Sequence, residues 1–390
     1  MKRVVVIGFG LGGLSLAKNL IREDPDAEIT IVGDERPYVR HKLRLTIAGR
    51  DISVPTDKLE ASGVRIIDGR AVKIKREQRE VVLETGEALP YDYLVIATGA
   101  EPSQPPVPGG ELTMGYRKIG DIERLREASP SRVAIVGASL VALHAADTCI
   151  HLGAEPHVIV RSRLVRKSLE PELSQELEER LSRVGVVFEK GKVKRITEDG
   201  VEIDSKMVEA DLTIAAMGVS PEVELARDCG IELEGGWVIK VDRRGQTSDP
   251  RVYAVGDAAL AYNPITGKPE YLAIGGAAAI MAFNAARAIA GKRGMMRTPR
   301  YIKDVFLGGN YLVSVGFTSP EAEKAGFEVD RVELRDTRWG DRAFFVFERE
   351  SRKLLGFSSV SSRDIGEASV EAMRGVVRRK RVEELVGEVS

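Results

Sequence analysis

Three glycines near the start of the sequence have the spacing of a nucleotide-binding turn. Gly8, Gly10 and Gly13 follow a continuous apolar run at residues 3–7 and precede a segment of helical periodicity at residues 14–21. The first glycine permits a tight turn, and the second lets the backbone approach a pyrophosphate. The third allows close packing of the helix, whose N-terminus supplies N–H donors. The spacing therefore predicts a strand, a phosphate-binding turn and a helix.

A carboxylate completes this first unit. A second apolar run, at residues 28–32, follows the helix and leads to Asp34. In dinucleotide-binding units, an acidic residue about 20 residues beyond the turn accepts hydrogen bonds from the ribose hydroxyls. Asp34 is therefore the predicted ribose ligand.

The same order of elements recurs later in the chain. It consists of an apolar run, a turn, a helical segment and a second apolar run at residues 132–136, 137–142, 143–152 and 157–160. Only Gly137 keeps the glycine pattern, because Ser139 takes the second position and Ala142 the third. The hydroxymethyl group of Ser139 either donates to a phosphate or obstructs its approach. The repeat predicts two mononucleotide-binding units in one chain.

Two further segments extend the pattern. Residues 91–100 read Tyr-Asp-Tyr-Leu-Val-Ile-Ala-Thr-Gly-Ala, and residues 247–257 read Thr-Ser-Asp-Pro-Arg-Val-Tyr-Ala-Val-Gly-Asp. With the two turns, they make the sequence resemble the flavin-dependent pyridine nucleotide-disulfide oxidoreductase superfamily over nearly the whole chain. The resemblance implies FAD in the first site, with Thr98 and Gly99 near the isoalloxazine and Asp257 hydrogen-bonded to the ribityl chain.

The glycines at Gly275 and Gly276 begin another predicted helix. Its N-terminal dipole could face the flavin pyrimidine and stabilise negative charge on the reduced ring. Tight helix packing is a second interpretation, and it is compatible with the first.

The resemblance implies an α/β protein with two Rossmann-like domains, one for FAD and one for NAD(P)H, and a small α+β C-terminal domain. We expect a discontinuous FAD domain at residues 1–108 and 245–300, an NAD(P)H domain at 109–244 and a C-terminal domain at 301–390. From about residue 301 the pattern changes to alternating strands. This last segment resembles the short C-terminal domains of rubredoxin-reductase and NADH-oxidase relatives but lacks their extended dimer tail, so a homodimer stays an open alternative.

Basic side chains follow the second unit. Val160 occupies the place where an NAD site has an acid, and the cations that come after it are Arg161, Arg163, Arg166 and Lys167. This resembles the NADPH-selecting members of the superfamily, in which arginines pair with the 2'-phosphate. We therefore predict NADPH as the preferred nucleotide, with NADH as a second substrate. A solvated surface cluster is the alternative interpretation.

Two more residues of the second site are predicted. In the family a glutamate often lies two residues past the third glycine of the turn, near the nicotinamide, and this chain has His144 there. His144 either contacts the nicotinamide or is a packed helix histidine. Gly218 ends the strand predicted at residues 211–216 and is a further predicted cofactor residue.

The cysteines do not form a redox pair. The chain has two, Cys149 and Cys229, and neither lies in a C-x-x-C or C-x4-C spacing. The segment at residues 36–46, where many relatives hold a redox cysteine, has none. Its Tyr38, Arg40 and Leu43 instead resemble the rubredoxin and ferredoxin reductases of the superfamily, which lack the thiol, and imply Arg40 as a cofactor residue. No metal site and no catalytic side chain are predicted, because the flavin carries the chemistry.

Composition excludes several classes of protein. The 390 residues include 58 basic and 59 acidic side chains with a net charge of -1, so no bulk positive field favours nucleic acid or an anionic membrane. The apolar stretch at residues 273–290 is rich in Ala and Gly and contains Asn284 and Arg287, which predicts a buried helix rather than a membrane span. Few cysteines and no signal-peptide pattern predict a cytoplasmic protein.

The leading hypothesis is an FAD-dependent NAD(P)H reductase that needs no thiol. Its electron acceptor would be a small redox protein such as rubredoxin or ferredoxin, a quinone-like molecule or dioxygen. A CoA-disulfide or polysulfide reductase is the first alternative, and it would need an unrecognised thiol. A flavin-binding interaction protein, whose degenerate second site no longer takes NAD(P)H, is the second; Ser139 and His144 motivate it.

Overall fold

The computed structural model describes residues 1–204 and 206–387. The chain divides into two compact units. Unit 1 comprises Met1–Val39, Ser53–Glu101 and Val219–Arg300, and unit 2 comprises Arg40–Ile52, Pro102–Gly218 and Tyr301–Ser390. The fold class is α/β with parallel sheets of the Rossmann-like type, as expected. The division into three domains stays a prediction.

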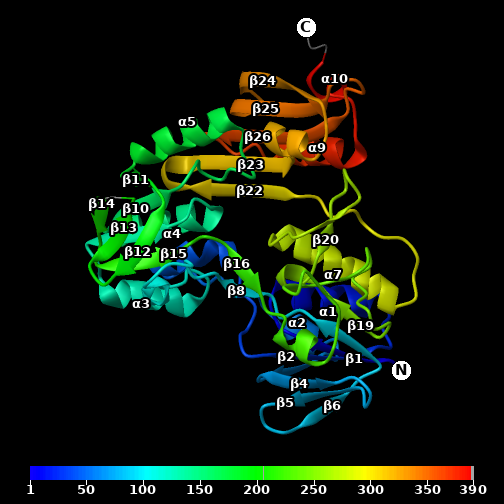
Figure 1. Cartoon of the computed structure of the whole chain (residues 1–390). Helices are drawn as coiled ribbons and strands as arrows, with labels where there is room; N and C mark the ends of the chain where they lie inside the picture. The colour runs from blue at the N-terminus through cyan, green and yellow to red at the C-terminus, as the bar shows by residue number, and fades with distance from the viewer. Residues whose placement is uncertain (205, 388–390) are drawn as a thin grey trace. The chain divides into compact units, whose positions relative to one another are not determined.

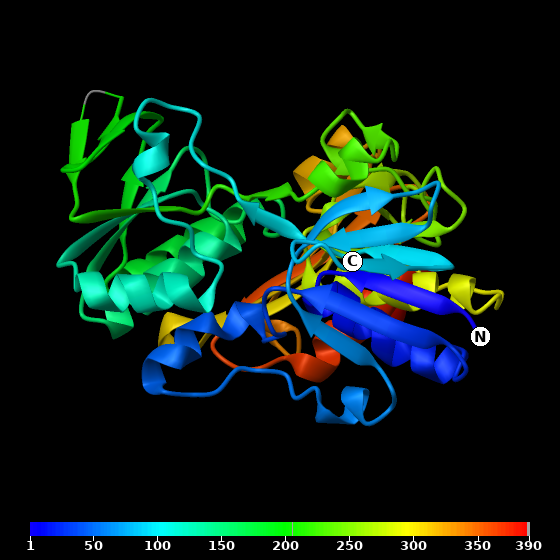
Figure 2. The same cartoon turned by 90° about the horizontal axis from the view of Figure 1, so that it is seen from below.

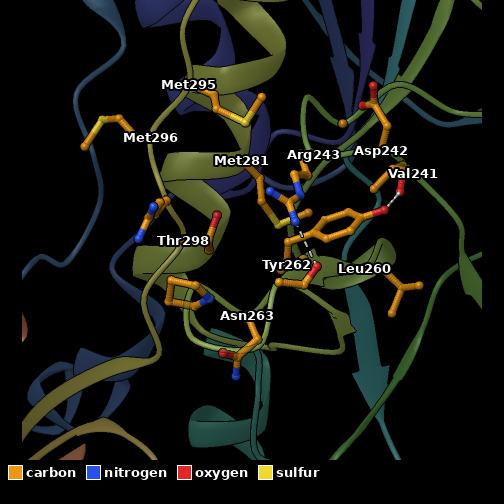
Figure 3. A pocket seen from close by; sticks show the side chains of 15 residues that line it. Val241, Asp242, Arg243, Leu260, Tyr262, Asn263, Met281, Met295, Met296 and Thr298 are labelled. Atoms are coloured by element: carbon orange, nitrogen blue, oxygen red, sulfur yellow. Dashed lines mark hydrogen bonds between the residues drawn. The ribbon is translucent and has the colours of Figure 1, made fainter. Parts of the chain in front are cut away.

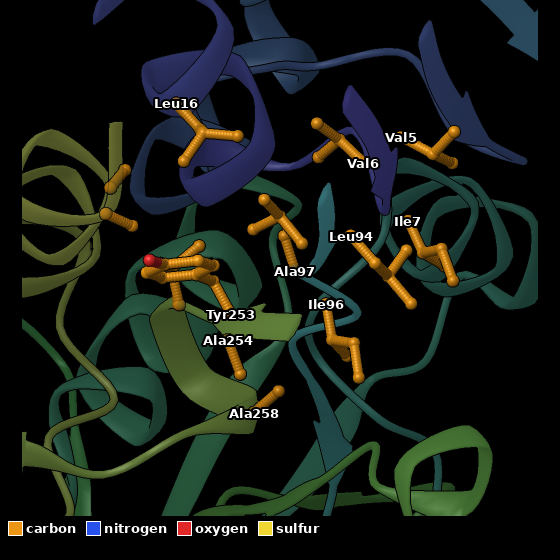
Figure 4. Packing of buried hydrophobic residues seen from close by; sticks show 14 of the residues in the cluster. Val5, Val6, Ile7, Leu16, Leu94, Ile96, Ala97, Tyr253, Ala254 and Ala258 are labelled. Atoms are coloured by element: carbon orange, nitrogen blue, oxygen red, sulfur yellow. The ribbon is translucent and has the colours of Figure 1, made fainter. Parts of the chain in front are cut away.

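The main sheet of unit 1 has five parallel strands in the order β19-β7-β1-β2-β3. The strands are β1 (Arg3–Ile7), β2 (Glu28–Gly33), β3 (Arg65–Asp68), β7 (Tyr93–Ile96) and β19 (Val252–Ala254). Most of them are continuous apolar runs because a parallel sheet is covered on both faces. Figure 4 shows part of this core, with Val5, Val6, Ile7, Leu16, Leu94, Ile96, Ala97, Tyr253, Ala254 and Ala258.

Helices α1 (Leu11–Glu23) and α7 (Gly275–Ile289) pack against each other in unit 1 (Figure 1). Leu16, Ala17 and Leu20 of α1 are fully buried, and α7 buries a row of alanines. Small side chains let two helices approach closely. The apolar stretch at residues 273–290 is therefore a packed helix, and among the described residues we find none long and apolar enough to span a membrane.

Smaller elements complete unit 1. An antiparallel sheet consists of β4 (Ala71–Lys75), β5 (Glu80–Leu83) and β6 (Ala88–Pro90). Figure 2 shows this sheet in light blue beside the dark-blue strands of the main sheet. The other elements are α2 (Asp57–Glu60), β8 (Ala100–Pro102), β16 (Val219–Pro221), α6 (Glu224–Asp228), β17 (Leu233–Glu234), β18 (Val238–Ile239), η3 (Gly256–Ala258), β20 (Ala261–Tyr262) and β21 (Pro269–Glu270).

Unit 2 contains a second parallel sheet, in the order β11-β10-β9-β15. Its strands are β9 (Arg132–Val136), β10 (Glu155–Val160), β11 (Val187–Lys190) and β15 (Leu212–Ala215). Helices α3 (Ile119–Ala128), α4 (Leu140–His151) and α5 (Pro171–Ser182), the segments η1 (Arg40–Ala48) and η2 (Gly110–Leu112), and the small sheet β12 (Val193–Thr197), β13 (Gly200–Ile203) and β14 (Lys206–Glu209) accompany it.

An antiparallel sheet begins at Tyr301, where the sequence pattern changes. Its order is β22-β23-β26-β25-β24, and its core contains a cluster of the rings of Trp339, Phe345 and Phe357. The elements are β22 (Tyr301–Phe306), η4 (Leu307–Gly309), β23 (Asn310–Gly316), α8 (Ser319–Lys324), β24 (Val329–Thr337), β25 (Gly340–Glu348), β26 (Leu354–Ser361), α9 (Gly366–Arg378) and α10 (Glu383–Val386).

The first turn of α1 offers a paired test of the packing. A Cβ on Gly13 would lie 2.1 Å from the backbone oxygen of Gly8, whereas a Cβ on Gly12 would lie 3.4 Å from its nearest neighbour, a methyl of Val255. We expect Gly13→Ala to lower the free energy of unfolding by about 1–3 kcal/mol. Gly12→Ala should leave it unchanged or raise it by up to about 1 kcal/mol. Urea unfolding of both variants, compared at equal cofactor content, measures the difference, and equal stabilities would refute the close approach.

Candidate functional site

The parallel sheet of unit 1 gathers the residues predicted for the first nucleotide. Its neighbouring strands β19, β7, β1 and β2 lead directly into four predicted segments. These segments contain Asp257, then Thr98 and Gly99, then Gly8, and then Asp34. Because parallel strands end at the same edge of a sheet, residues far apart in sequence meet where α/β proteins bind ligands.

The first turn is built by close backbone contact. Gly8 has a φ of 104°, and a Cβ there would lie 2.2 Å from the carbonyl oxygen of Ala97 at the end of β7. At Gly10 a Cβ would meet no described atom within 4 Å, so the space beside the turn is open. Helix α1 has no side-chain cap and no acidic residue in its first turn. Its N-terminal amides therefore suit the pyrophosphate of a dinucleotide.

The other segments at this edge are held by internal contacts. The hydroxyl of Thr98 donates to the backbone oxygen of Glu222 (2.6 Å), and the carbonyl of Gly99 accepts from the amide of Glu222 (3.0 Å). Thr98 thus fixes its own turn. A Cβ on Gly275 would lie 2.9 Å from a methyl of Leu11, which confirms tight packing at the start of α7. That helix also has no side-chain cap, so its amides remain suited to negative charge.

A second carboxylate lies beside the predicted ribose ligand. Asp34 is exposed, whereas Glu35 is half-buried and accepts a hydrogen bond from the hydroxyl of Tyr38 (2.7 Å). A carboxylate held by a neighbour is better oriented than an exposed one. Glu35 is therefore a second candidate that the spacing rule missed, although the adjacent acids after Gly33 were visible in the sequence.

The second parallel sheet gathers the other predicted set. The neighbouring strands β10, β9 and β15 lead to Arg161, to Gly137 and to Gly218, respectively. Gly137 has a φ of 134°, and a Cβ there would lie 2.3 Å from the carbonyl oxygen of Ala216. The same constraint that shapes the first turn therefore shapes the second.

Ser139 makes the second turn different from the first. It is the N-cap residue of α4, where its hydroxyl oxygen accepts from the amide of Ala142 (3.4 Å). Its hydroxyl proton goes to the carbonyl oxygen of Ala216 (2.8 Å). In this structure Ser139 therefore caps the N-terminus of α4, and its hydroxyl proton is donated to a protein carbonyl. Ala142 is fully buried, as the third position of the pattern requires.

The basic residues after β10 fall into two groups. Arg161, Arg166 and Lys167 are exposed, whereas Arg163 is half-buried. The guanidinium of Arg163 donates to the carbonyls of Leu169 (2.5 Å) and Arg166 (2.9 Å), and burial lowers its pKa from the usual value. The exposed residues are thus the better candidates for an anionic ligand.

His144 and Arg40 have protein partners. The Nε2 atom of His144 lies 2.7 Å from Asp304 in β22, its ring packs against Phe306, and its side chain is buried. These contacts favour the interpretation as a packed histidine. Arg40 donates to the carbonyl of Arg117 (2.9 Å). Cofactor contacts for His144, Arg40 and Gly218 stay predictions.

Comparison with known proteins adds to this geometry. The model of the family described as pyridine nucleotide-disulphide oxidoreductase matches residues 2–290. The chain belongs to this family. Pyridine nucleotide-disulphide oxidoreductases of this type bind FAD and use NAD(P)H, and the chain is an NAD(P)H-dependent oxidoreductase.

Three relatives illustrate the range of the family. An NADH oxidase of Methanocaldococcus jannaschii is 29% identical over 74% of this chain and 70% of its own length. A CoA-dependent NAD(P)H sulfur oxidoreductase of Pyrococcus furiosus is 26% identical over 93% of this chain and 88% of its own. The solved structure of a ferredoxin reductase of Rhodopseudomonas palustris is 27% identical over 92% of this chain and 91% of that one, with a TM-score of 0.81.

In this pyridine nucleotide-disulphide oxidoreductase the surroundings of both thiols favour the protonated form. Cys149 lies in α4 of unit 2 and is fully buried, and burial raises its pKa to about 12. Cys229 lies in unit 1, is half-buried and donates to the carbonyl of Ala226 (3.4 Å); burial raises its pKa as well. Both are free cysteines. A protonated, buried thiol is a poor nucleophile.

A cavity of about 120 Å³ lies elsewhere in unit 1 (Figure 3). It is lined by apolar side chains such as Leu260, Met281 and Met295 and by the stacked pair of Arg243 and Tyr262. The hydroxyl of Tyr262 donates to the carbonyl of Val241 (3.1 Å), as Figure 3 shows. None of the lining residues is a predicted cofactor residue, so the cavity is separate from the glycine turn.

The raised pKa of Cys149 leads to a test of thiol chemistry. With a pKa of about 12, roughly one Cys149 thiol in ten thousand is ionised at pH 8. We expect iodoacetamide at pH 8 to leave Cys149 unmodified in the folded holoenzyme and to modify it after unfolding, as measured by mass spectrometry. The Cys149→Ala, Cys229→Ser variant should keep its turnover with an artificial acceptor. Loss of turnover at unchanged FAD content would point to a redox thiol.

Proposed function

We propose that this chain is an FAD-dependent NAD(P)H oxidoreductase that passes electrons to its acceptor without a redox cysteine. The observation that carries the proposal is the convergence, at one edge of a parallel sheet, of Gly8, Thr98 and Asp257, beside an open and uncapped helix start. The raised pKa values of the buried Cys149 and the half-buried Cys229 support the absence of a redox cysteine.

The residues of unit 1 fit the groups of FAD. The amides at the start of α1 would hold the pyrophosphate, with Gly10 leaving room for it and Gly13 keeping the helix close. Asp34 or Glu35 would accept from the ribose hydroxyls, and Asp257 from the ribityl chain. When bound, FAD supplies hydride acceptance from NAD(P)H and delivery of the electrons to an acceptor.

The residues of the second parallel sheet would hold NAD(P)H. The turn at Gly137 would receive the pyrophosphate, although the Ser139 cap makes this site less open than the first. Arg161, Arg166 and Lys167 would pair with the adenosine 2'-phosphate, because Val160 offers no acid to repel it. We propose NADPH as the preferred nucleotide on this charge argument.

The proposed acceptor is a small redox protein such as rubredoxin or ferredoxin, a quinone-like molecule or dioxygen. Similarity to a ferredoxin reductase and to an NADH oxidase supports this range. The similarity to a CoA-dependent sulfur oxidoreductase favours a second candidate, the reduction of CoA disulfide or polysulfide. An acceptor screen that follows NADPH oxidation decides between them, with the cysteine-free variant as the control.

The first prediction of this proposal is a flavoprotein. We expect the purified protein to show the two visible bands of noncovalent FAD, which anaerobic NADPH should bleach. A colourless protein that takes up no FAD would overturn the proposal, and a flavin that NADPH does not reduce would favour a binding protein. Asp257→Ala should weaken FAD retention roughly 10- to 150-fold, the equivalent of one charge-assisted hydrogen bond. Asp249→Ala, a change in the preceding turn, is the matched control.

The charge argument predicts the choice of nucleotide. We expect Arg161→Ala to raise the Michaelis constant for NADPH about tenfold or more and to leave that for NADH nearly unchanged, because only NADPH carries the 2'-phosphate. Steady-state kinetics with both nucleotides measure the effect. Equal losses for both would indicate a general structural defect, and a wild-type preference for NADH would show that the basic residues are surface charge.

A further inference from the structure

The basic loop at residues 161–170 contains a strained residue. Val165 has a φ of 44°, a left-handed conformation that is rare for a β-branched side chain, and it is buried. Its amide donates to the carbonyl of Ala138 (2.7 Å), and its own carbonyl accepts from the amides of Ser168 (2.7 Å) and Leu169 (3.1 Å). Ala138 lies between Gly137 and Ser139. The strained residue therefore joins the loop to the phosphate turn.

The guanidinium of Arg163 forms hydrogen bonds within the same loop. It donates to the carbonyls of Leu169 and Arg166 and to the hydroxyl of Ser174 (3.3 Å). The hydroxyl of Ser174 in turn donates to the carbonyl of Leu164 (2.7 Å). Because the planar guanidinium donates in fixed directions, one side chain joins two points of the loop to the start of α5.

The far end of the loop is anchored by a buried carboxylate. Glu170 is fully buried and accepts from the amide of Ser319 (2.6 Å), from the Ser319 hydroxyl and from Arg331 (3.2 Å). A buried charge with three donors holds its position, because each lost partner would leave it unpaired. The loop is thus held by hydrogen bonds of Val165, Arg163 and Glu170. Arg161 and Arg166 stay exposed.

We propose that Arg163 and Val165 are positioning residues for the 2'-phosphate of NADPH, which hold the loop in one conformation before the nucleotide binds. This inference rests on the proposed function. Backbone strain persists only where the surroundings determine it, and here it brings the loop against the turn that would hold the pyrophosphate. In this proposal Arg161 and Arg166 are the phosphate ligands. The guanidinium of Arg163 instead donates to groups of the loop and of α5.

Binding of the oxidised nucleotides to the FAD-loaded enzyme tests the role of Arg163 without turnover. If loss of these hydrogen bonds leaves the loop in its binding conformation for about a tenth of the time, the apparent Kd for NADP⁺ rises about tenfold. We expect Arg163→Ala and Arg163→Lys to show this rise equally in calorimetry, with the Kd for NAD⁺ within about twofold of wild type. Lysine keeps the charge but lacks the guanidinium geometry. Arg163→Lys binding NADP⁺ like wild type would overturn the proposal, because the loop would then not need the hydrogen bonds of the guanidinium.

A matched control and a structural readout accompany this test. Arg183→Ala removes an exposed arginine of the same unit and should change neither Kd. Hydrogen exchange of the nucleotide-free enzyme reports the loop directly, because the amides of Val165, Ser168 and Leu169 are hydrogen-bonded. We expect both Arg163 variants to exchange about tenfold faster at residues 161–170 and nowhere else. Unchanged exchange in the variants would overturn the positioning role.

Substitution of Val165 tests the strained conformation. Glycine adopts a positive φ freely and keeps the amide that donates to Ala138, whereas proline can do neither. We expect Val165→Gly to bind NADP⁺ within about threefold of wild type and Val165→Pro to lose about tenfold, with NAD⁺ affinity kept. Val165→Pro binding NADP⁺ like wild type would overturn the role of the strain.

Arg161→Ala separates this inference from the function on which it rests. If wild type binds NADP⁺ no tighter than NAD⁺ and Arg161→Ala changes neither, the phosphate site itself is wrong, and the positioning role fails with it. If wild type prefers NADP⁺ and Arg161→Ala weakens it, but Arg163→Lys does not, the phosphate site stands and only the positioning role fails.

Discussion

The contact of a glycine with the end of the neighbouring parallel strand is the constraint on which both sites depend. A Cβ on Gly8 would lie 2.2 Å from the carbonyl oxygen of Ala97, and a Cβ on Gly137 would lie 2.3 Å from that of Ala216. In each case the turn between the first strand and the following helix passes close to the end of the strand that lies beside it in the sheet. This approach leaves no room for a side chain and brings the helix start to the sheet edge where the other strands end. The two units share this geometry although their sequences differ.

The residues beyond each turn separate the two sites by charge. In unit 1 the helix start is uncapped and the next strand is followed by Asp34 and Glu35, so amides suited to a phosphate and carboxylates suited to a ribose lie in adjacent segments. In unit 2 a serine caps the helix, and a loop with three arginines follows the next strand. The same backbone geometry is thus followed by two carboxylates in unit 1 and by a basic loop in unit 2. The specificity proposed for the second site lies in the loop rather than in the turn.

The strands, turns and helices of both parallel sheets could be predicted because each depends on local pattern. The apolar runs at residues 3–7 and 132–136 are β1 and β9, and the glycine spacing places the turns after them. Contacts between distant segments could not be predicted in this way. The pairing of His144 with Asp304, 160 residues away, and the use of Arg163 within its own loop leave no signature in spacing or periodicity. The four cations within residues 161–167 therefore look alike in the sequence, although Arg163 is half-buried and the other three are exposed.

Segment η1, which contains no cysteine, is held in place by a charged pair. Arg44 lies 3.0 Å from the buried carboxylate of Asp147 and donates to the carbonyl of Val305 (3.2 Å). Burial raises the pKa of Asp147, and the charge of Arg44 opposes part of that rise. The segment is anchored by charge. On the proposed function, electrons then have no protein thiol between cofactor and acceptor. The acceptor must approach the cofactor itself, which a redox protein, a quinone-like molecule or dioxygen can do without thiol exchange.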